Sequence, residues 1–200
     1  MAITAAQVKE LRDKTQAGFM DCKSALSEAD GDLDKAITVL RTRGQARAAK
    51  RSGRSTSQGM VGSYIHMGGQ VGVLIEVGCE SDFVARTDEF QTLVREISMH
   101  IAAANPTYLD RSDVPKEDID REKEIFRAQF EGSKKPPDVI DKIVEGKLNN
   151  YYQQVVLLDQ PSIREPKTSV GELVTAAIAK MGENITIARF ARFKIGEAKD

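Results

Sequence analysis

Few residues in this sequence have the types and spacing that covalent or metal chemistry requires. The only histidines are His66 and His100, and the only cysteines are Cys22 and Cys79. Their spacings match no zinc motif such as C-x-x-C or H-E-x-x-H. A Cys79–His66 pair could form a nucleophile and its base, but no third group that would orient the pair is evident. Cys79 is more simply explained as a small apolar residue that ends a strand.

The usual phosphate-binding motifs are also missing from the sequence. Neither G-x-x-x-x-G-K-[ST] nor a strand–G-x-G-x-x-G–helix unit occurs, so a self-sufficient nucleotide site is not expected. Carboxylates are abundant, but they fall among basic residues on predicted helix faces, which is typical of solvated surfaces. We therefore expect a protein that is not an enzyme and that has no metal site and no cofactor.

One segment, CESDFVAR from Cys79 to Arg86, has an unusual composition for the end of a strand. In a purely structural interpretation, Ser81 or Asp82 caps a short helix, Phe83 and Val84 enter the core, and Arg86 pairs with Asp82. In a functional interpretation, Asp82 and Phe83 are an acid and an exposed aromatic ring on a tight turn. Such a pair can act as a wedge, because the ring fills a pocket of a partner while the carboxylate perturbs the local charge.

A basic segment separates the first part of the chain from the rest. Six cations with no acid among them lie between residues 41 and 57: Arg41, Arg43, Arg47, Lys50, Arg51 and Arg54. Alanines favour a helix in its first half, and Ser and Gly favour a loose tether after it, so we interpret it as a helical linker. The alternative is an RNA-associated translation module that binds phosphates through this stripe. The stripe lacks the interleaved aromatic residues of a stacking platform, so direct nucleic-acid binding is not expected.

Composition places further limits on the class of protein. With 29 basic and 30 acidic residues the net charge is −1, which disfavours a globally basic nucleic-acid binder. Two cysteines in 200 residues are too few for a disulfide framework, so a reducing compartment is expected. No apolar run approaches the ~20 residues of a membrane span, and the N-terminal residues do not have the pattern of a signal peptide. We expect a cytoplasmic protein that does not bind membranes.

The first 44 residues have the pattern of a small helical module. Thr4 can cap a first helix, a second helix follows Gly18, and Asp32 can cap a third helix that ends at Gly44. Three helices of this size make a marginal core, so docking onto a partner is plausible for the module. We predict three parts: a docking module over residues 1–44, the linker over 45–58, and a core domain over 59–200.

The core domain is expected to be α+β. Two β-rich runs flank Gly68-Gly69 and predict a hairpin, and residues 184–194 predict a third strand, with a bulge near Ala188 or Arg189. Four helical stripes accompany these strands, over residues 87–104, 116–130, 137–155 and 168–181. The second and third stripes carry mixed charge and are expected to pair as an antiparallel helical hairpin. About three antiparallel strands packed with helices give the α+β class.

Two segments of the chain resemble the elongation factor Ts family. The segment from Glu10 to Gly44, ELRDKTQAGFMDCKSALSEADGDLDKAITVLRTRG, resembles the N-terminal module of that family, which is UBA-like. The segment CESDFVAR resembles the core signature of the family. The resemblance continues through YIHMGGQVGVLIEV, LLDQPS, TSVGEL and GENITIARFARF, so it covers essentially the whole chain.

The resemblance implies a function that composition does not show. Members of this family are guanine-nucleotide exchange factors for elongation factor Tu, a translational GTPase. It implies that the N-terminal module docks on the nucleotide-binding domain of the GTPase and that the core signature inserts near its Mg²⁺ site. The implied inserting residues are Asp82 and Phe83, with Ser81 and Val84 shaping the turn. More loosely, it implies a partner-facing hairpin, with these candidates: Tyr64, His66, Gly68 and Gly69.

The chain departs from the family pattern at a few positions. Gln16 stands where the module usually has glycine, Phe19 adds an aromatic residue, and Ser81 replaces the more usual threonine while keeping the capping hydroxyl. The chain has one core signature and no second core half, so it resembles the short form of the family. Because long forms carry a duplicated core, the resemblance makes a homodimer an expectation for this chain.

Overall fold

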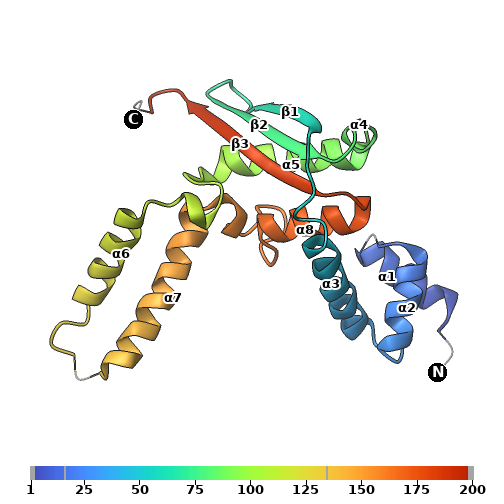
Figure 1. The fold of residues 1–200 in the computed structure, drawn as a ribbon, viewed down its shortest axis with the longest axis horizontal. Helices are drawn as coiled ribbons and strands as arrows, with labels where there is room; N and C mark the ends of the chain where they lie inside the picture. Colours follow the sequence, from blue (N-terminus) through green and yellow to red (C-terminus); the bar gives the residue numbers. More distant parts are fainter. Residues whose placement is uncertain (1–2, 16, 134, 198–200) are drawn as a thin grey trace. The chain divides into compact units, whose positions relative to one another are not determined.

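The structure, a computed structural model, describes residues 3–15, 17–133 and 135–197 (Figure 1). Gln16, one of the departures noted above, lies outside the described residues. By its internal contacts the chain forms two compact units, which are described separately below. The first unit holds residues 1–60, 77–93 and 173–186, and the second holds residues 61–76, 94–172 and 187–200. The domain boundaries after residues 44 and 58 stay predictions.

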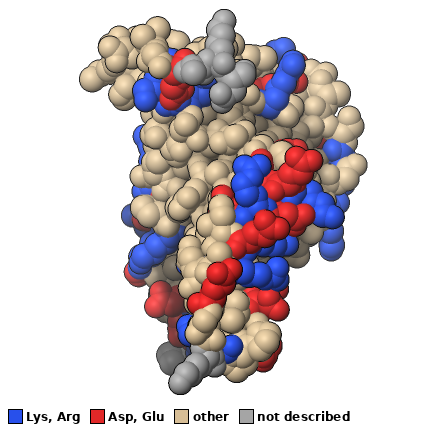
Figure 2. Space-filling model, turned by 90° about the vertical axis from the view of Figure 1, so that its left-hand side faces the viewer, with Lys and Arg blue, Asp and Glu red and all other residues tan. Residues whose placement is uncertain are grey.

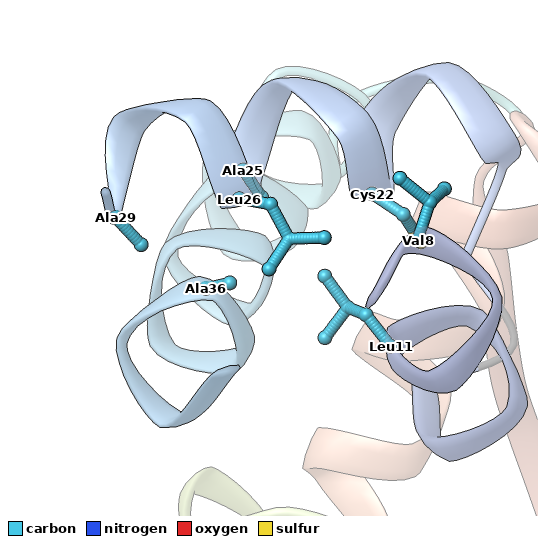
Figure 3. Packing of buried hydrophobic residues seen from close by; sticks show 7 residues of the cluster. All are labelled: Val8, Leu11, Cys22, Ala25, Leu26, Ala29 and Ala36. Atoms are coloured by element: carbon cyan, nitrogen blue, oxygen red, sulfur yellow. The ribbon is translucent and has the colours of Figure 1, made fainter. Parts of the chain in front are cut away.

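Three helices begin the first unit: α1 (Ala5–Thr15), α2 (Phe19–Glu28) and α3 (Leu33–Ala49). Their buried side chains form one small cluster (Figure 3), made of Val8, Leu11, Cys22, Ala25, Leu26, Ala29 and Ala36. Six partly buried hydrophobic residues pack against this cluster: Ile3, Ala17, Leu33, Ile37, Val39 and Leu40. That this core is marginal on its own stays a prediction.

Local capping explains where two of these helices begin. The Gln7 backbone N–H donates to Thr4 Oγ1 at 3.3 Å, and the Thr4 N–H donates to Gln7 Oε1 at 3.0 Å, which forms a capping box at α1. At α3, the Lys35 N–H donates to the Asp32 carboxylate at 3.0 Å. Both predicted caps are confirmed.

The prediction that Gly44 ends the third helix is wrong. Helix α3 continues through Gly44 to Ala49, so the helical half of the basic segment is an extension of the module's last helix. A Cβ atom added to Gly44 would lie 3.4 Å from the Cβ of Ala179. The glycine therefore allows close packing of the helix, a reason that the local sequence does not reveal.

The segment after α3 is anchored, whereas the sequence favours a loose tether. Asn184 Nδ2 donates to the Arg54 carbonyl at 2.8 Å, and the hydroxyls of Thr56 and Thr186 lie 2.7 Å apart. All four residues belong to the first unit. Hydrogen bonds to residues far along the chain fix this segment, and its Ser- and Gly-rich composition could not predict them.

The strands form one three-stranded antiparallel sheet in the order β1 (Gln58–Ile65), β2 (Val71–Cys79) and β3 (Ile185–Lys194). The predicted hairpin joins β1 to β2. Gly68 and Gly69 have φ values of +89° and +70°, a conformation that favours glycine in such turns.

Helix α5 (Asp88–Ala104) packs against the inner face of this sheet in the second unit. A Cβ atom added to Gly62 would lie 2.3 Å from Val94 Cγ1 and 3.7 Å from Ser98 Oγ. Gly62 therefore lets the helix approach β1 more closely than any side chain would allow. Val73 and Ile75 of β2 are buried, as expected for the inner face.

The burial of β3 changes phase where the sequence predicts a bulge. Ile185 and Ile187 are buried, Ala188 and Arg189 are both exposed, and Phe190 is again half-buried. Because Ala188 and Arg189 are both exposed, the alternation shifts by one residue, and Phe190 returns to the face of Ile185 and Ile187. This is the effect that a bulge has on strand alternation.

The remaining helices follow the predicted order. They are the single turn α4 (Asp82–Ala85), α6 (Lys116–Ala128), α7 (Pro137–Val155) and α8 (Val170–Met181). Two short 3₁₀ turns, η1 (Arg111–Asp113) and η2 (Leu157–Asp159), complete the elements of the described residues. The boundaries of α5, α6, α7 and α8 differ from those predicted by no more than two residues. The α+β class is confirmed.

Helices α6 and α7 form the expected antiparallel hairpin (Figure 1). Arg127 Nη2 lies 2.9 Å from Asp141 Oδ1, and the Lys147 ammonium lies 5.6 Å from the centre of the Phe126 ring. Figure 2 shows acidic and basic side chains interleaved over this part of the molecule. The mixed charge is thus a solvated face, as the sequence indicates.

Candidate functional site

The core-signature turn presents Phe83 to solvent. Ser81 caps α4, because its Oγ accepts the Val84 N–H at 3.3 Å, and Val84 is buried with 9% of its surface exposed. Phe83, one residue earlier, has 81% of its surface exposed. The purely structural interpretation is therefore right for the Ser81 cap and for Val84, and it is wrong for Phe83. The ring therefore lies outside the core and is accessible from solvent.

Asp82 lies beside this ring on the same helical turn. Its carboxylate pairs with Arg86 at 2.9 Å, as the spacing predicts, and both side chains are mostly exposed. Ion pairs in water contribute ~0–1 kcal/mol. Arg86 can therefore release Asp82 at little cost when another cation or donor approaches.

Ser81 is also held from outside its own helix. Its backbone N–H donates to Glu183 Oε2 at 3.0 Å, and its hydroxyl donates to Glu183 Oε1 at 2.6 Å. One carboxylate thus satisfies two donors of the residue that begins α4. Glu183 lies in the turn between α8 and β3, 102 residues further along the chain.

A second carboxylate makes the reciprocal contact between the same two turns. Glu80 Oε1 accepts the Asn184 N–H at 2.6 Å, and Glu80 Oε2 accepts from Arg54 at 3.2 Å, with Arg51 3.5 Å away. The Asn184 N–H, together with the two arginines, holds the pKa of Glu80 below its usual value. Glu80 therefore stays ionised at neutral pH and keeps both turns in place.

Sequence reasoning missed Glu80, Glu183 and Asn184 as parts of this site. The sequence signal for these residues was weak, since it consists of Gly182 and two polar residues before β3. In the structure Gly182 has φ at +75° and follows the end of α8. Polar residues at that place read as an ordinary turn. Nothing local in the sequence pairs them with the core signature.

Cys79 has the environment of a structural cysteine. It is fully buried, and its thiol donates to the Ser81 carbonyl at 3.0 Å. Burial raises the pKa of this thiol, and the nearby charge of Glu183 raises it further. A thiol held protonated is a poor nucleophile, so these observations favour the structural interpretation of Cys79.

His100 is likewise explained by packing. It is buried, one ring nitrogen lies 2.8 Å from Gln160 Oε1, and the other accepts the Ile163 N–H at 3.4 Å. Burial lowers its pKa, which keeps the ring neutral. Within the described ranges, no group of three or more His, Cys, Asp or Glu side chains could hold a metal ion.

The hairpin candidates Tyr64, His66, Gly68 and Gly69 lie in the second unit, whereas Ser81–Val84 lie in the first. The Tyr64 hydroxyl lies 3.0 Å from His66 Nδ1, so these two side chains are brought together. Met67, between His66 and Gly68, is 90% exposed at the tip of the turn.

The cations of the basic segment largely face acids of the same chain. Arg47 makes two hydrogen bonds to Asp21, at 2.7 and 3.0 Å, which lower the pKa of Asp21. Arg43 pairs with Glu28, and Arg51 and Arg54 pair with Glu80, as described above. These pairs favour a structural role for the segment over a phosphate-binding stripe.

Comparison with known proteins identifies the class. The family model described as elongation factor TS matches residues 4–197. The chain is 55% identical over 197 residues to "Elongation factor Ts" of Koribacter versatilis, covering 98% of this chain and 90% of the relative. It is 56% identical over 195 residues to that of Caldanaerobacter subterraneus, covering 98% of each. The relative from Thermodesulfovibrio yellowstonii is 52% identical over the full 200 residues of both chains.

These matches place the chain among translation elongation factors. A match over nearly the whole length, at this identity, goes beyond a shared fold. The chain belongs to the elongation factor Ts family. Along the described part of the chain, no helix is both long enough and apolar enough to cross a membrane.

Proposed function

We propose that this protein is the guanine-nucleotide exchange factor for elongation factor Tu in translation elongation, and that Ser81, Asp82, Phe83 and Val84 form the segment that enters the GTPase. Family membership supports the class of function. The observation that carries the site is the 81% exposure of Phe83 on a turn fixed by Ser81 and Glu183. A large ring in solvent has a cost that burial in a partner would offset.

The mechanism is non-covalent. A GTPase holds its nucleotide through phosphate contacts and a bridging Mg²⁺, which demands near-ideal octahedral geometry. Phe83 inserts between elements of the GTPase and shifts them, while Asp82 brings a carboxylate close to the disturbed metal shell. Ser81 and Val84 fix the turn from the protein side. The chain makes and breaks no bond, so it acts without a cofactor and is not an enzyme.

Thermodynamic linkage explains how such a wedge promotes exchange. A protein that prefers the distorted, empty GTPase lowers the affinity of the GTPase for GDP. By linkage, GDP lowers the affinity of the GTPase for that protein by the same factor. GDP then leaves, and GTP, which is offered in excess, binds and releases the factor.

We assign the first docking step to residues 1–44, with residues 45–58 as the linker and 59–200 as the domain that carries the wedge. The cytoplasm is where these partners would meet.

The hairpin supplies a second contact in this proposal. Tyr64, His66 and the Gly68-Gly69 turn would face elongation factor Tu, with the exposed Met67 at the tip adding apolar area. The close pair of Tyr64 and His66 presents a polar edge beside it. This contact would orient the factor on the GTPase rather than disturb the metal.

We further infer that the chain forms a homodimer through the outer face of its sheet. Val61, Ile65 and Leu74 are 67%, 67% and 49% exposed, and Phe193 is 65% exposed. Val61 and Ile65 alternate with Gly62, which faces α5, so they lie on the opposite face of the sheet. Sedimentation velocity should give a dimer for the natural chain and a monomer for Phe193→Lys. A natural chain that sediments as a monomer at all concentrations would refute the dimer.

Co-elution with elongation factor Tu tests the function itself. In size-exclusion chromatography without nucleotide, the two proteins should elute together. Excess GDP with Mg²⁺ should separate them, because linkage makes nucleotide and factor compete. Separate elution without nucleotide, or a complex that GDP leaves intact, would contradict the proposal.

A further inference from the structure

Helix α4 is too short to hold its own conformation. It has four residues, Asp82–Ala85, and isolated helices below ~12 residues are marginal in water. Its only buried side chain is Val84. The direction in which Phe83 points must therefore be fixed by groups outside the helix.

Four residues supply these outside contacts, and we name them the carboxylate brace: Glu80, Ser81, Glu183 and Asn184. Two neighbours in one turn, Glu80 and Ser81, cross-pair with two neighbours in the other, Asn184 and Glu183. In each pair, a carboxylate accepts from a backbone N–H, a charge-assisted bond stronger than one between neutral groups. All four residues belong to the first compact unit.

The Ser81 hydroxyl links the brace to α4. It donates to Glu183 Oε1 at 2.6 Å and accepts the Val84 N–H at 3.3 Å. The carboxylate thereby orients the hydroxyl so that its lone pair faces the helix. Hydrogen bonds arranged in a chain polarise and strengthen one another.

The brace is itself secured on its far side. Asn184 is buried, and its side-chain amide donates to the Arg54 carbonyl at 2.8 Å, while Arg54 pairs with Glu80 at 3.2 Å. Each carboxylate of the brace thus has more than one donor. Such a fully satisfied network favours one arrangement of the turn over others.

We infer that Glu183 and Glu80 are positioning residues for nucleotide exchange, holding α4 in the conformation in which Phe83 enters the GTPase. The inference rests on the proposed function and assigns Glu183 and Glu80 a role that they exert through Ser81 and the turn that begins α4. A binding segment that is held ready loses less freedom on binding. If only a fraction of molecules has the competent turn, exchange falls in proportion to that fraction.

A double-mutant cycle on the intact chain tests this role. The measured quantity is the apparent second-order rate constant of fluorescent GDP release from elongation factor Tu at sub-saturating factor, because the fraction of competent turns scales the apparent affinity. Glu183→Ala should lower this rate about tenfold, since it removes charge-assisted bonds that favour the ordered turn. In the Asp82→Ala/Phe83→Ala background, the same change should have no further effect, because no wedge remains to be positioned.

Two further variants complete the design. Glu183→Gln keeps one acceptor for Ser81 and should release GDP at an intermediate rate. Glu96→Ala is the matched control, because it removes a carboxylate that pairs with Arg164 in the second unit, and it should release GDP at the natural rate. Circular dichroism reports the folded fraction, and where Glu183→Ala lowers it, the same cycle is run with Glu183→Gln.

The outcomes separate this inference from the proposed function. A natural rate in Glu183→Ala, or an equal loss in both backgrounds, would overturn the positioning role while leaving the function in place. If the natural chain does not accelerate GDP release, the proposed function fails. If it does but Asp82→Ala/Phe83→Ala is equally fast, the assignment of the wedge fails and the positioning role fails with it.

Discussion

Phe83 and Val84 are neighbours on one helical turn, yet the ring lies in solvent and the valine lies in the core. A single turn has one inward face, and Val84 occupies it. The Ser81 cap and its bonds to Glu183 then fix the rotation of the turn. Phe83 is therefore exposed because its neighbour Val84 is the residue that anchors the turn in the core.

The Ser81 hydroxyl should contribute measurably to stability. Ser81→Ala removes the cap of α4 and one donor to Glu183, so we expect a loss of about 1–2 kcal/mol in the free energy of unfolding. Urea denaturation measures this loss. Ser81→Thr keeps the hydroxyl and serves as the control, which should remain within about 0.5 kcal/mol of the natural chain. An alanine variant as stable as the natural chain would show that the cap contributes nothing.

The lowered pKa of Glu80 predicts a dependence of stability on pH. A carboxyl group whose pKa is lower in the folded protein than in the unfolded chain stabilises the folded protein when it is ionised. For Glu80 the unfolded pKa is 4.5, so this stabilisation is present above pH 4.5 and is lost as the pH falls below it. Glu80→Gln should therefore lower the thermal unfolding midpoint between pH 5 and 7. The difference from the natural chain should shrink steadily below pH ~4.5. A difference that is constant down to pH 3 would contradict this assignment.

At the scale of elements, two glycines show opposite roles. Gly62 lies in β1 next to α5, so an added Cβ would meet Val94 Cγ1 at 2.3 Å. Gly146 lies inside α7 with nothing within 4 Å of the position of its Cβ. The first glycine is required by packing, whereas the second only weakens its helix.

This contrast predicts opposite effects of the same substitution. Gly62→Ala should destabilise the protein by about 1–3 kcal/mol, because a methyl group overpacks the contact between strand and helix. Gly146→Ala should stabilise it by about 0.5–1 kcal/mol through helix propensity. Urea unfolding of the two variants side by side checks both signs. Equal effects in the two variants would mean that α5 does not approach β1 as described.

The predictions that hold are those that depend on short stretches of sequence. The caps at Thr4 and Asp32 and the hairpin at Gly68 follow from residues within a few positions of one another. The prediction that α3 ends at Gly44 is wrong, because the residue that Gly44 packs against, Ala179, lies far along the chain. The brace was missed for the same reason.

The candidate site was only partly predictable from the sequence. The sequence indicates Ser81 as a cap and leaves two interpretations of Phe83, and only the structure decides whether the ring is exposed. Family resemblance supplies the partner, which no residue pattern reveals. The roles of Ser81–Val84 and of the hairpin stay predictions until exchange is measured.

At the scale of the whole molecule, charge is balanced locally as well as in sum. The net charge is −1, and the arginines of the basic segment face acids such as Asp21 and Glu80. The four arginines of the basic segment that face acids are less available to phosphates than free cations would be. This pairing favours the prediction that the chain does not bind nucleic acid directly.

Weak RNA binding is the corresponding prediction. Filter binding to single-stranded RNA should show negligible retention at about 150 mM salt and only weak retention at about 50 mM salt. Polylysine of matched length provides a positive control for counterion release. Tight binding with a steep salt dependence would instead favour the RNA-associated module that uses residues 41–54.

The most direct test of the central claim is stopped-flow release of fluorescent GDP from elongation factor Tu, comparing the natural chain with Phe83→Ala and Asp82→Ala. Each variant should keep its unfolding midpoint, because both side chains are mostly exposed. We predict rapid release with the natural chain and release slowed about tenfold or more in each variant, as expected when a buried interface residue worth above ~1.4 kcal/mol is truncated. Natural release rates in both variants would contradict the account.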